Sequence, residues 1–193
     1  MLFMDKIISL DHFFTNFLNQ LFPHNIFFNS FFAFFSLKGS SIFVWLLVML
    51  IVLVLEERKN PGITKQDKKI IILFSLAFLI TVLFTDVIFK NIFQRPRPLL
   101  SSNINYLASS TCPRDFSFPS THAATAFASA TILTFFDKKR RWFYYMVALL
   151  ISYSRIYLGC HYFFDVVSGA IIGYLISRLF LFFPCTFPSH RKS

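Results

Sequence analysis

Five long apolar segments, joined by short polar connections, dominate the pattern along the chain. They are residues 39–55, 70–89, 118–136, 142–158 and 162–183. A helix needs roughly 20 residues to cross the hydrocarbon core of a bilayer, and each segment is close to that length. Because a backbone in lipid must satisfy its own hydrogen bonds, we expect each segment to form a helix.

Two further patterns precede the first long segment. Apolar residues recur at helical spacing between residues 7 and 22, with polar residues such as Asp11 and Asn19 between them, which predicts an amphipathic helix lying in the membrane interface. Residues 26–37 are apolar but number only 12. They suit a short span, a re-entrant segment or the start of one kinked helix that continues to residue 55, and we favour the kinked helix.

The composition agrees with a membrane protein, since 55% of the residues are hydrophobic and only 15% are charged. We therefore predict an all-α fold, a polytopic bundle of five or six transmembrane helices with an N-terminal amphipathic interfacial helix. Residues 1–193 would form a single membrane domain, made of an interfacial arm (1–25), a transmembrane core (26–184) and a basic cytoplasmic tail (185–193). The first residues lack the pattern of a cleaved signal peptide, so we expect the mature chain to begin at or near Met1.

The net charge of +10 is explained by topology rather than by nucleic acid binding. Basic residues are concentrated in residues 56–69, 137–141 and 191–192, beside apolar segments, with no basic patch interleaved with exposed aromatics. The positive-inside rule places these loops in the cytoplasm. Residues 90–117 and the turn at 159–161 then lie on the extracytoplasmic side of a cytoplasmic (inner) membrane, and no nucleic acid partner is expected.

Basic and prolyl residues follow the second long segment, in K-N-I-F-Q-R-P-R-P. The two prolines force the chain out of a helix after Lys90, and Arg95 and Arg97 precede them. With no acidic residue close after them, these cations favour an anionic ligand, and contact with lipid headgroups is the simpler alternative. Asp86 lies one turn before Lys90 and is placed to hold it.

A second polar cluster, F-S-F-P-S-T-H, opens the third long segment. Pro119 suits the first turn of a helix and Ser117 is placed to cap it, which would leave the N–H groups of Ser120 and Thr121 free to bind an anion. His122 lies in the same turn and ordinarily titrates near pH 6.5. An ordinary helix cap beside an interfacial histidine is the alternative.

The turn between the last two long segments carries Arg155, His161 and Asp165. His161 and Asp165 are four residues apart, so on a helix the carboxylate reaches one ring nitrogen and makes the other more nucleophilic. A salt-bridged hairpin between Arg155 and Asp165 is the structural alternative. Together the clusters bring histidines, a carboxylate and several cations to one membrane face, which favours phosphoryl transfer.

These three elements resemble the motifs of the type 2 phosphatidic acid phosphatase family, the integral-membrane lipid phosphate phosphatases. That family carries a lysine, six residues and Arg-Pro; then Pro-Ser-Gly-His; then Ser-Arg, five residues, His, three residues and Asp. The matching residues here are Lys90 and Arg97-Pro98, Pro119-Ser120-Thr121-His122, and Ser154-Arg155, His161 and Asp165. The chain is similar to small bacterial members, including undecaprenyl diphosphate phosphatases of the bacitracin-resistance type.

The resemblance implies a role for each matching residue. His161 would be the nucleophile that forms a phosphohistidine, Asp165 would hold it, and His122 would be the general acid and later the base. The residues expected to hold the phosphoryl oxygens are Lys90, Arg97, Ser120, Thr121 and Arg155. Asp86 and Arg95 would be supporting residues. No metal or other cofactor is expected, because fixed cations would replace it.

One departure from the family pattern is Thr121, which stands where the family has glycine. A threonine is compatible with the first turn of a helix, so its backbone donor can be kept, but its side chain narrows the pocket. We expect this to bear on the substrate more than on the reaction.

We therefore expect a metal-independent membrane phosphatase that hydrolyses a lipid phosphate monoester or diphosphate at the extracytoplasmic face. Undecaprenyl diphosphate, phosphatidic acid, phosphatidylglycerol phosphate and lipid A phosphate are all candidate substrates. A phosphotransferase using the same phosphohistidine and a non-catalytic lipid-binding membrane protein are the alternatives. The expected partners are the lipid substrate and membrane lipids, and the sequence does not set the oligomeric state.

The three cysteines show no spacing typical of a metal site. Cys112 and Cys160 both fall on the predicted extracytoplasmic side, where oxidation is possible. We favour two free thiols there, with a disulfide as the alternative.

Overall fold

The structure is a computed structural model that describes residues 2–36, 40–57, 65–98 and 112–182. All regular secondary structure in these residues is helical, which confirms the predicted all-α fold. The long apolar segments correspond to α3 (Ser40–Glu57), α4 (Lys65–Val82), α7 (Thr121–Phe136), α8 (Arg141–Tyr157) and α9 (Phe163–Phe182). Of the described helices, two pass a test of length and hydropathy for a membrane span, Gln66–Phe93 and Phe163–Phe182.

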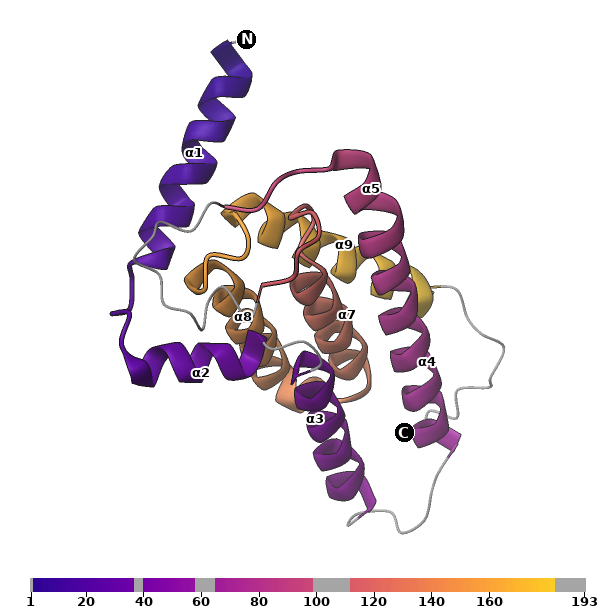
Figure 1. The fold of residues 1–193 in the computed structure, drawn as a ribbon. Helices are drawn as coiled ribbons and strands as arrows, with labels where there is room; N and C mark the ends of the chain where they lie inside the picture. The colour runs from indigo at the N-terminus through magenta and orange to yellow at the C-terminus, as the bar shows by residue number, and fades with distance from the viewer. Residues whose placement is uncertain (1, 37–39, 58–64, 99–111, 183–193) are drawn as a thin grey trace.

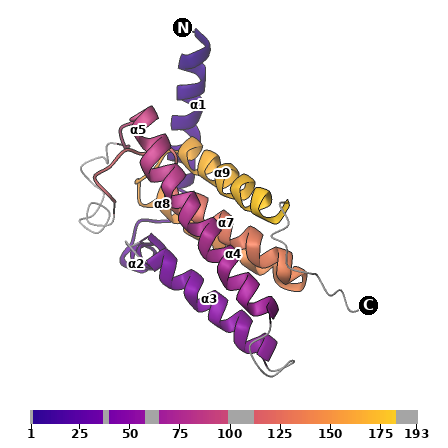
Figure 2. The ribbon, with the colours of Figure 1, turned by 90° about the vertical axis from the view of Figure 1, so that its right-hand side faces the viewer.

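Helix α7 lies at the centre of the bundle, packed against α4, α8 and α9 (Figures 1 and 2). Its contact with α9 is close because Gly169 and Gly173 present bare backbone to α7. A Cβ atom on Gly173 would lie well within contact distance of the carbonyl group of Ala124, and one on Gly169 would clash with the carbonyl of Ser120. Small residues spaced four apart permit such close helix packing in membrane proteins.

Helix α4 continues past its apolar part through a π-helical segment, η1 (Leu83–Phe89), into the short α5 (Lys90–Phe93). The helix ends at Gln94, whose φ of 44° is left-handed, and Pro96 prevents its continuation. Short π-helical turns are frequent at functional sites, and this one carries Asp86 just before Lys90.

The described residues between 26 and 55 form two helices of different direction, not the single kinked helix that we favoured. Helix α2 (Ile26–Ser36) lies across the bundle, whereas α3 runs along it (Figure 1). The change of direction is stabilised at the end of α2, where Arg155 of α8 donates hydrogen bonds to the carbonyl and hydroxyl oxygens of Ser36. A helix end leaves carbonyl groups without partners, and the guanidinium satisfies one of them.

Helix α1 (Leu2–Asn19) is the predicted amphipathic helix, but its orientation differs from that of a simple interfacial helix. Its polar stripe faces the protein, where Asp11 and Thr15 are buried, while apolar residues such as Phe13 and Phe17 are exposed. The first part of α1 projects away from the bundle (Figures 1 and 2).

The helix ends described here lie at two opposite ends of the bundle. The end of α5, the start of α7, the end of α8 and the start of α9 meet at one end, and the end of α3 and the start of α4 lie at the other (Figures 1 and 2). The helix ends beside the basic segment 56–69 therefore lie opposite those that carry the three clusters, and the side of the membrane that each end faces stays a prediction. The basic tail (185–193) and the loop at 99–111 lie outside the described residues.

Candidate active site

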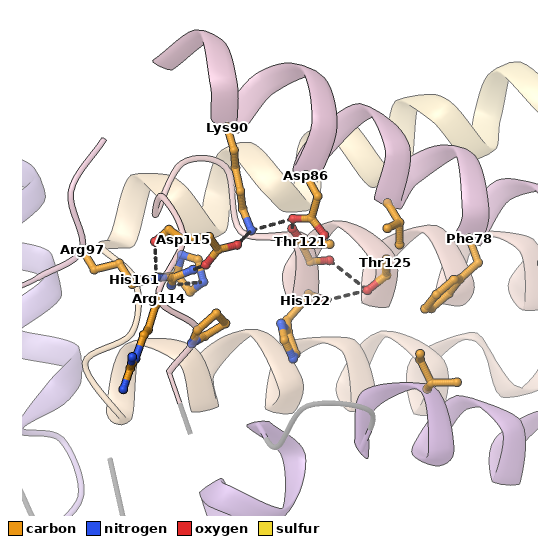
Figure 3. A pocket seen from close by; sticks show the side chains of 13 residues that line it. Phe78, Asp86, Lys90, Arg97, Arg114, Asp115, Thr121, His122, Thr125 and His161 are labelled. Atoms are coloured by element: carbon orange, nitrogen blue, oxygen red, sulfur yellow. Dashed lines mark hydrogen bonds and ion pairs between the residues drawn. The ribbon is translucent and has the colours of Figure 1, made fainter. Parts of the chain in front are cut away.

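A cavity of about 450 Å³ opens at the end of the bundle where the three sequence clusters meet (Figure 3). The predicted site residues that line it are Asp86, Lys90, Arg97, Thr121, His122 and His161. Its far part is apolar and is lined by Ile42 of α3 with Phe78 and Val82 of α4. The predicted residues Ser120, Arg155 and Asp165 are fully buried and do not line the cavity.

A carboxylate that sequence reasoning did not select, Asp115, lies between two of the predicted phosphate-binding cations. Lys90 Nζ is 2.6 Å from Asp115 Oδ2 and 2.6 Å from Asp86 Oδ1. Arg97 donates from Nη2 to Asp115 Oδ1 and from Nε to the Asp115 carbonyl oxygen, the latter over 2.9 Å. Burial would raise the pKa of Asp115, but hydrogen bonds from Lys90 and Arg97 outweigh it and lower this pKa to about 2. The cations are thus held together by an internal anion.

His161 is buried in the turn before α9, with each ring nitrogen held by a different partner. Nδ1 lies 2.8 Å from the carbonyl oxygen of Ser117, and Nε2 lies 3.0 Å from Arg97 Nη1. A carbonyl oxygen only accepts, so Nδ1 carries the proton and Nε2 keeps its lone pair. Burial, followed by the charges of Arg155 and Arg97, lowers the pKa of His161 well below its ordinary value. The imidazole is therefore neutral at pH 7, with its basic nitrogen facing the cations.

Asp165 supports His161 less directly than the spacing predicted. Its Oδ2 is 3.6 Å from His161 Nδ1, too far for a hydrogen bond, and accepts instead from the backbone N–H of Tyr162 at 2.9 Å. The reason is that α9 begins only at Phe163, so His161 is not on the same helix. Asp165 Oδ1 pairs with Arg95 Nη1 at 2.6 Å, rather than with Arg155.

The first turn of α7 also differs from the prediction. Ser120, not Ser117, is the N-cap residue, and it follows a cis peptide bond between Phe118 and Pro119. The Ser120 backbone N–H is not free, because it donates to the Asp165 carbonyl oxygen at 2.9 Å. The Ser120 hydroxyl is buried and has no partner among the described residues.

The two residues after Ser120 reach the cavity itself. The Thr121 hydroxyl donates to Asp86 Oδ1, which ties the residue at the family's glycine position to the carboxylate that holds Lys90. His122 points into the cavity (Figure 3), and its ring makes no hydrogen bond within the described part of the chain. It is therefore placed to exchange a proton with a molecule in the cavity.

Arg155 lies behind the cavity and is fully buried. Its Nη1 donates a hydrogen bond to the carbonyl oxygen of Ser36. Its Nε and Nη2 atoms are buried without a hydrogen-bond partner among the described residues. Unsatisfied donors in a buried guanidinium are costly, so they need an acceptor that the described residues do not supply. An anion in the site would be such an acceptor.

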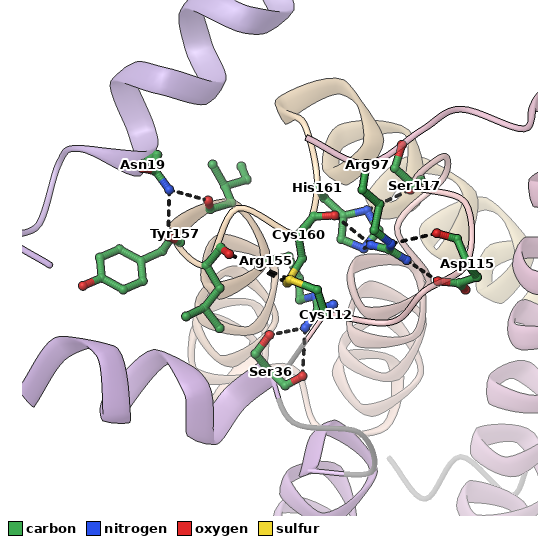
Figure 4. The surroundings of a disulfide bond; sticks show 12 residues. Asn19, Ser36, Arg97, Cys112, Asp115, Ser117, Arg155, Tyr157, Cys160 and His161 are labelled. Carbon is green, nitrogen blue, oxygen red and sulfur yellow. Dashed lines mark hydrogen bonds and ion pairs between the residues drawn. A yellow bond between two sulfur atoms is a disulfide. The ribbon is translucent and has the colours of Figure 1, made fainter. Parts of the chain in front are cut away.

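A disulfide joins Cys112 to Cys160, contrary to the free thiols that we favoured (Figure 4). The bond connects the segment that carries Asp115 to the residue before His161. The Cys160 carbonyl oxygen also accepts from Arg97 Nη1 at 2.7 Å. Cys160 thus holds both the turn that carries His161 and the side chain of Arg97 beside it.

Sequence reasoning missed several residues that build this site. No motif spacing indicates the groups through which three of them act. These groups are the side chain of Asp115, the backbone carbonyl of Ser117, and the carbonyl and hydroxyl of Ser36. Asp115 had one signal, since it is an acidic residue that lies next to Arg114 and directly before the F-S-F-P element. Asp11 was assigned only to the polar face of the amphipathic helix, yet its Oδ2 is 2.6 Å from Arg95 Nη2.

Comparison with known proteins agrees with the geometry. Residues 68–187 match the family model described as the PAP2 superfamily. The chain belongs to the PAP2 superfamily. The match includes all three clusters that build the cavity, and it confirms the resemblance on which the residue roles rest.

Two relatives and one solved structure illustrate the range of this PAP2 protein's neighbours. An undecaprenyl-diphosphatase of Sulfolobus acidocaldarius is 31% identical over 71% of this chain and 62% of its own length. A lipid A 4'-phosphatase of Bacteroides thetaiotaomicron is 36% identical over 59% of this chain and 55% of its own length. The match thus spans less than two thirds of either relative.

The solved structure is that of a transmembrane PAP2-type phosphatidylglycerolphosphate phosphatase from Bacillus subtilis. It superposes with a TM-score of 0.65 at 22% identity and covers 96% of this chain and 90% of that one. At this identity the likeness shows a shared fold.

Proposed function

We propose that this PAP2 protein is a metal-independent phosphatase that hydrolyses a lipid phosphate monoester or diphosphate through a phosphohistidine. The observation that carries the proposal is the state of His161, whose unprotonated Nε2 lies 3.0 Å from Arg97 Nη1 in a cavity shared with Lys90. A phosphoryl group held by these cations would lie next to the nucleophilic nitrogen. Fixed cations that neutralise phosphoryl oxygens are the main catalytic requirement of phosphoryl transfer.

In the first step, the Nε2 lone pair of His161 forms a bond to phosphorus as the bond to the leaving oxygen breaks. Protonated His122 gives its proton to that oxygen, which leaves as the lipid alcohol or lipid monophosphate. The equatorial oxygens accept hydrogen bonds from Lys90 and Arg97. The unpartnered donors of Arg155 and Ser120 are the further groups proposed to bind them.

In the second step, water attacks the phosphorus of the phosphohistidine. His122, now neutral, takes a proton from the water, and the P–N bond breaks with its electron pair returning to His161 Nε2. Inorganic phosphate leaves and both histidines regain their starting protonation states. The Ser117 carbonyl holds the Nδ1 proton throughout, and Asp165 lies close enough to stabilise the positive imidazolium.

The apolar part of the cavity supports a lipid substrate. Ile42, Phe78 and Val82 extend the cavity from His122 toward α3 and α4, so an isoprenoid or acyl chain attached to the phosphate has an apolar path. We place the helices as five or six spans in the cytoplasmic membrane, with the cavity extracytoplasmic and residues 1–25 forming the interfacial arm. The disulfide supports an extracytoplasmic position of the cavity, since disulfides persist in oxidising compartments.

Undecaprenyl diphosphate is the substrate to test first, because the relative from Sulfolobus acidocaldarius, which has that activity in its name, matches 71% of this chain and the lipid A 4'-phosphatase matches 59%. Phosphatidic acid, phosphatidylglycerol phosphate and lipid A phosphate complete the panel. Transfer of the phosphoryl group to an acceptor other than water, or lipid binding without turnover, are outcomes that the same assay detects.

The test is release of inorganic phosphate from this panel by the purified full chain in detergent with excess EDTA. We expect release from at least one lipid, abolished in His161→Ala and strongly reduced in His122→Ala. Lipid binding with no release from any substrate would contradict the proposal. Loss of the lipid phosphate without free phosphate would instead indicate transfer to another acceptor.

A further inference from the structure

The polar stripe of α1 contacts both helix ends that flank the turn carrying His161. Asn19 Nδ2 donates to the carbonyl oxygens of Ile156 and Tyr157, at 2.9 and 2.7 Å, where α8 ends. Backbone groups at such helix ends lack partners within their own helix. The stripe supplies side chains to them from a distant part of the sequence.

At the start of α9 the same stripe accepts two backbone hydrogen bonds. Phe163 N–H donates to Thr15 Oγ1 and Phe164 N–H to Asp11 Oδ1, each at 2.8 Å. Helix α1 therefore caps α9 in the way that a local N-cap residue would. Because Asn19 also binds the end of α8, helix α1 contacts both helix ends around His161.

Asp11 makes one contact that Thr15 does not. Its second oxygen, Oδ2, pairs with Arg95 Nη2 at 2.6 Å, and Arg95 Nη1 pairs with Asp165 Oδ1 at 2.6 Å. Both carboxylates are buried, at 2% and 0% exposure, and the Arg95 guanidinium also lies 4.0 Å from the ring centre of Tyr162. The guanidinium is thus held from three sides.

Arg95 connects to both groups that support the His161 ring. Its side chain holds Asp165, and its carbonyl oxygen accepts from Ser117 N–H at 2.8 Å. The Ser117 carbonyl in turn accepts the Nδ1 proton of His161. A shift of Arg95 would therefore move both the ring's hydrogen-bond partner and its nearby carboxylate.

We propose that Asp11 is a positioning residue for the phosphoryl-transfer reaction, acting through Arg95 on the two groups that orient His161. The inference rests on the proposed function. Two carboxylates around one guanidinium leave a net negative charge beside His161, which stabilises the positive charge of the phosphohistidine. The N-terminal helix is then part of the catalytic apparatus as well as an interfacial arm.

The test compares initial rates of phosphate release across substrate concentrations for the full-length parent and three variants. Asp11→Asn keeps the shape of the side chain and removes its charge. Thr15→Val is the matched control, because it also removes a cap on α9 but makes no contact with Arg95. The Thr15 hydroxyl donates to the Asp11 backbone carbonyl and leaves the Asp11 carboxylate on Arg95 untouched. Asp5→Asn removes a charge from the exposed part of the same helix.

For Asp11→Asn we expect kcat to fall about tenfold while KM stays within about twofold, the pattern of a group that acts only in the transition state. For Thr15→Val and Asp5→Asn we expect kcat per folded molecule to match the parent. The folded fraction is measured by gel filtration and thermal unfolding in the same detergent. A kcat loss in Asp11→Asn that merely follows its folded fraction, or one that Thr15→Val shares, would overturn the proposal.

A double variant gives a second, independent readout. If Asp11 acts through Arg95, then Asp11→Asn should cause little further loss of kcat in an Arg95→Gln background, whereas unconnected residues would show additive losses. A parent that releases no phosphate contradicts the proposed function itself. An active parent with an equally active Asp11→Asn contradicts only the role of Asp11.

Discussion

At the scale of single residues, Asp115 holds the position between Lys90 and Arg97 that a substrate phosphate would need. Its carboxylate is a competing anion that is covalently part of the site. Binding of the phosphate therefore requires the charged hydrogen bonds to Asp115 to be exchanged for bonds to phosphoryl oxygens. In the proposed reaction this exchange would lower the apparent affinity for substrate and keep the cations in place between turnovers.

Asp115→Asn should accordingly lower KM. The side chain is 44% exposed, so solvent screens the interaction, and the gain is about 1 kcal/mol, or about a fivefold lower KM. Steady-state kinetics of phosphate release check this, with Asp137→Asn as a control because Asp137 pairs with Arg140 away from the site. A KM that rises in Asp115→Asn would show that the carboxylate assists binding.

The pH dependence of kcat/KM should reflect the lowered pKa of His161. In the proposed mechanism the neutral imidazole is the nucleophile. A lowered pKa of His161 would keep it active below pH 6.5, so the acid limb of the profile should lie below that value. Arg97→Gln removes one of the charges that lower this pKa and should move the acid limb upward. The parent and Arg97→Gln profiles are measured with the same substrate. A difference between the two acid limbs therefore comes from ionisation of the enzyme and not of the substrate. An acid limb that does not move would contradict this account.

At the scale of structural elements, the disulfide connects two segments that each carry part of the site. Cys112 and Cys160 are 48 residues apart, and closing a loop of this length restricts the unfolded chain by about 4 kcal/mol in the chain-entropy estimate. The same bond positions the carbonyl that holds Arg97. Stability and geometry of the site therefore depend on one covalent link.

Cys112→Ser should lower both the thermal midpoint and kcat, because Arg97 loses a fixed anchor. Cys160→Ser should give the same result, and Cys185→Ser, the third cysteine, should leave both values unchanged. Thermal unfolding and phosphate release, each measured with and without reductant, check the prediction. A parent whose midpoint and kcat do not respond to full reduction would contradict it.

The elements also show what the sequence could and could not predict. The long apolar segments gave the helices, and the three motifs gave a common site, because each motif lies at a helix end and these ends meet. The placement of α1 could not be read in advance, since its polar stripe has the pattern of a solvent-facing surface. Asp115 and Asp11 reach the site through pairs 25 and 84 residues apart, which no local pattern reveals.

At the scale of the whole molecule, the site depends on the close packing of α7 against α9. Gly169 and Gly173 bring the two helices together, and the Asp165 carbonyl then reaches Ser120 N–H. This contact aligns the turn that carries His161 with the turn that carries His122. The apolar outer faces of the bundle and of α1 leave the polar cavity at one end, which suits a lipid whose phosphate lies at the membrane surface.

The most direct test of the central claim is to trap the covalent intermediate. The purified full chain is mixed with a lipid diphosphate radiolabelled in its terminal phosphate, in EDTA, and denatured rapidly. We predict a protein-bound label that is labile in acid and stable in base, as a phosphohistidine is, and that is absent in His161→Ala. An equal amount of bound label in His161→Ala would contradict the account. The account would also be contradicted if the parent releases phosphate but no bound label is found at any quench time, either in the parent or in His122→Ala.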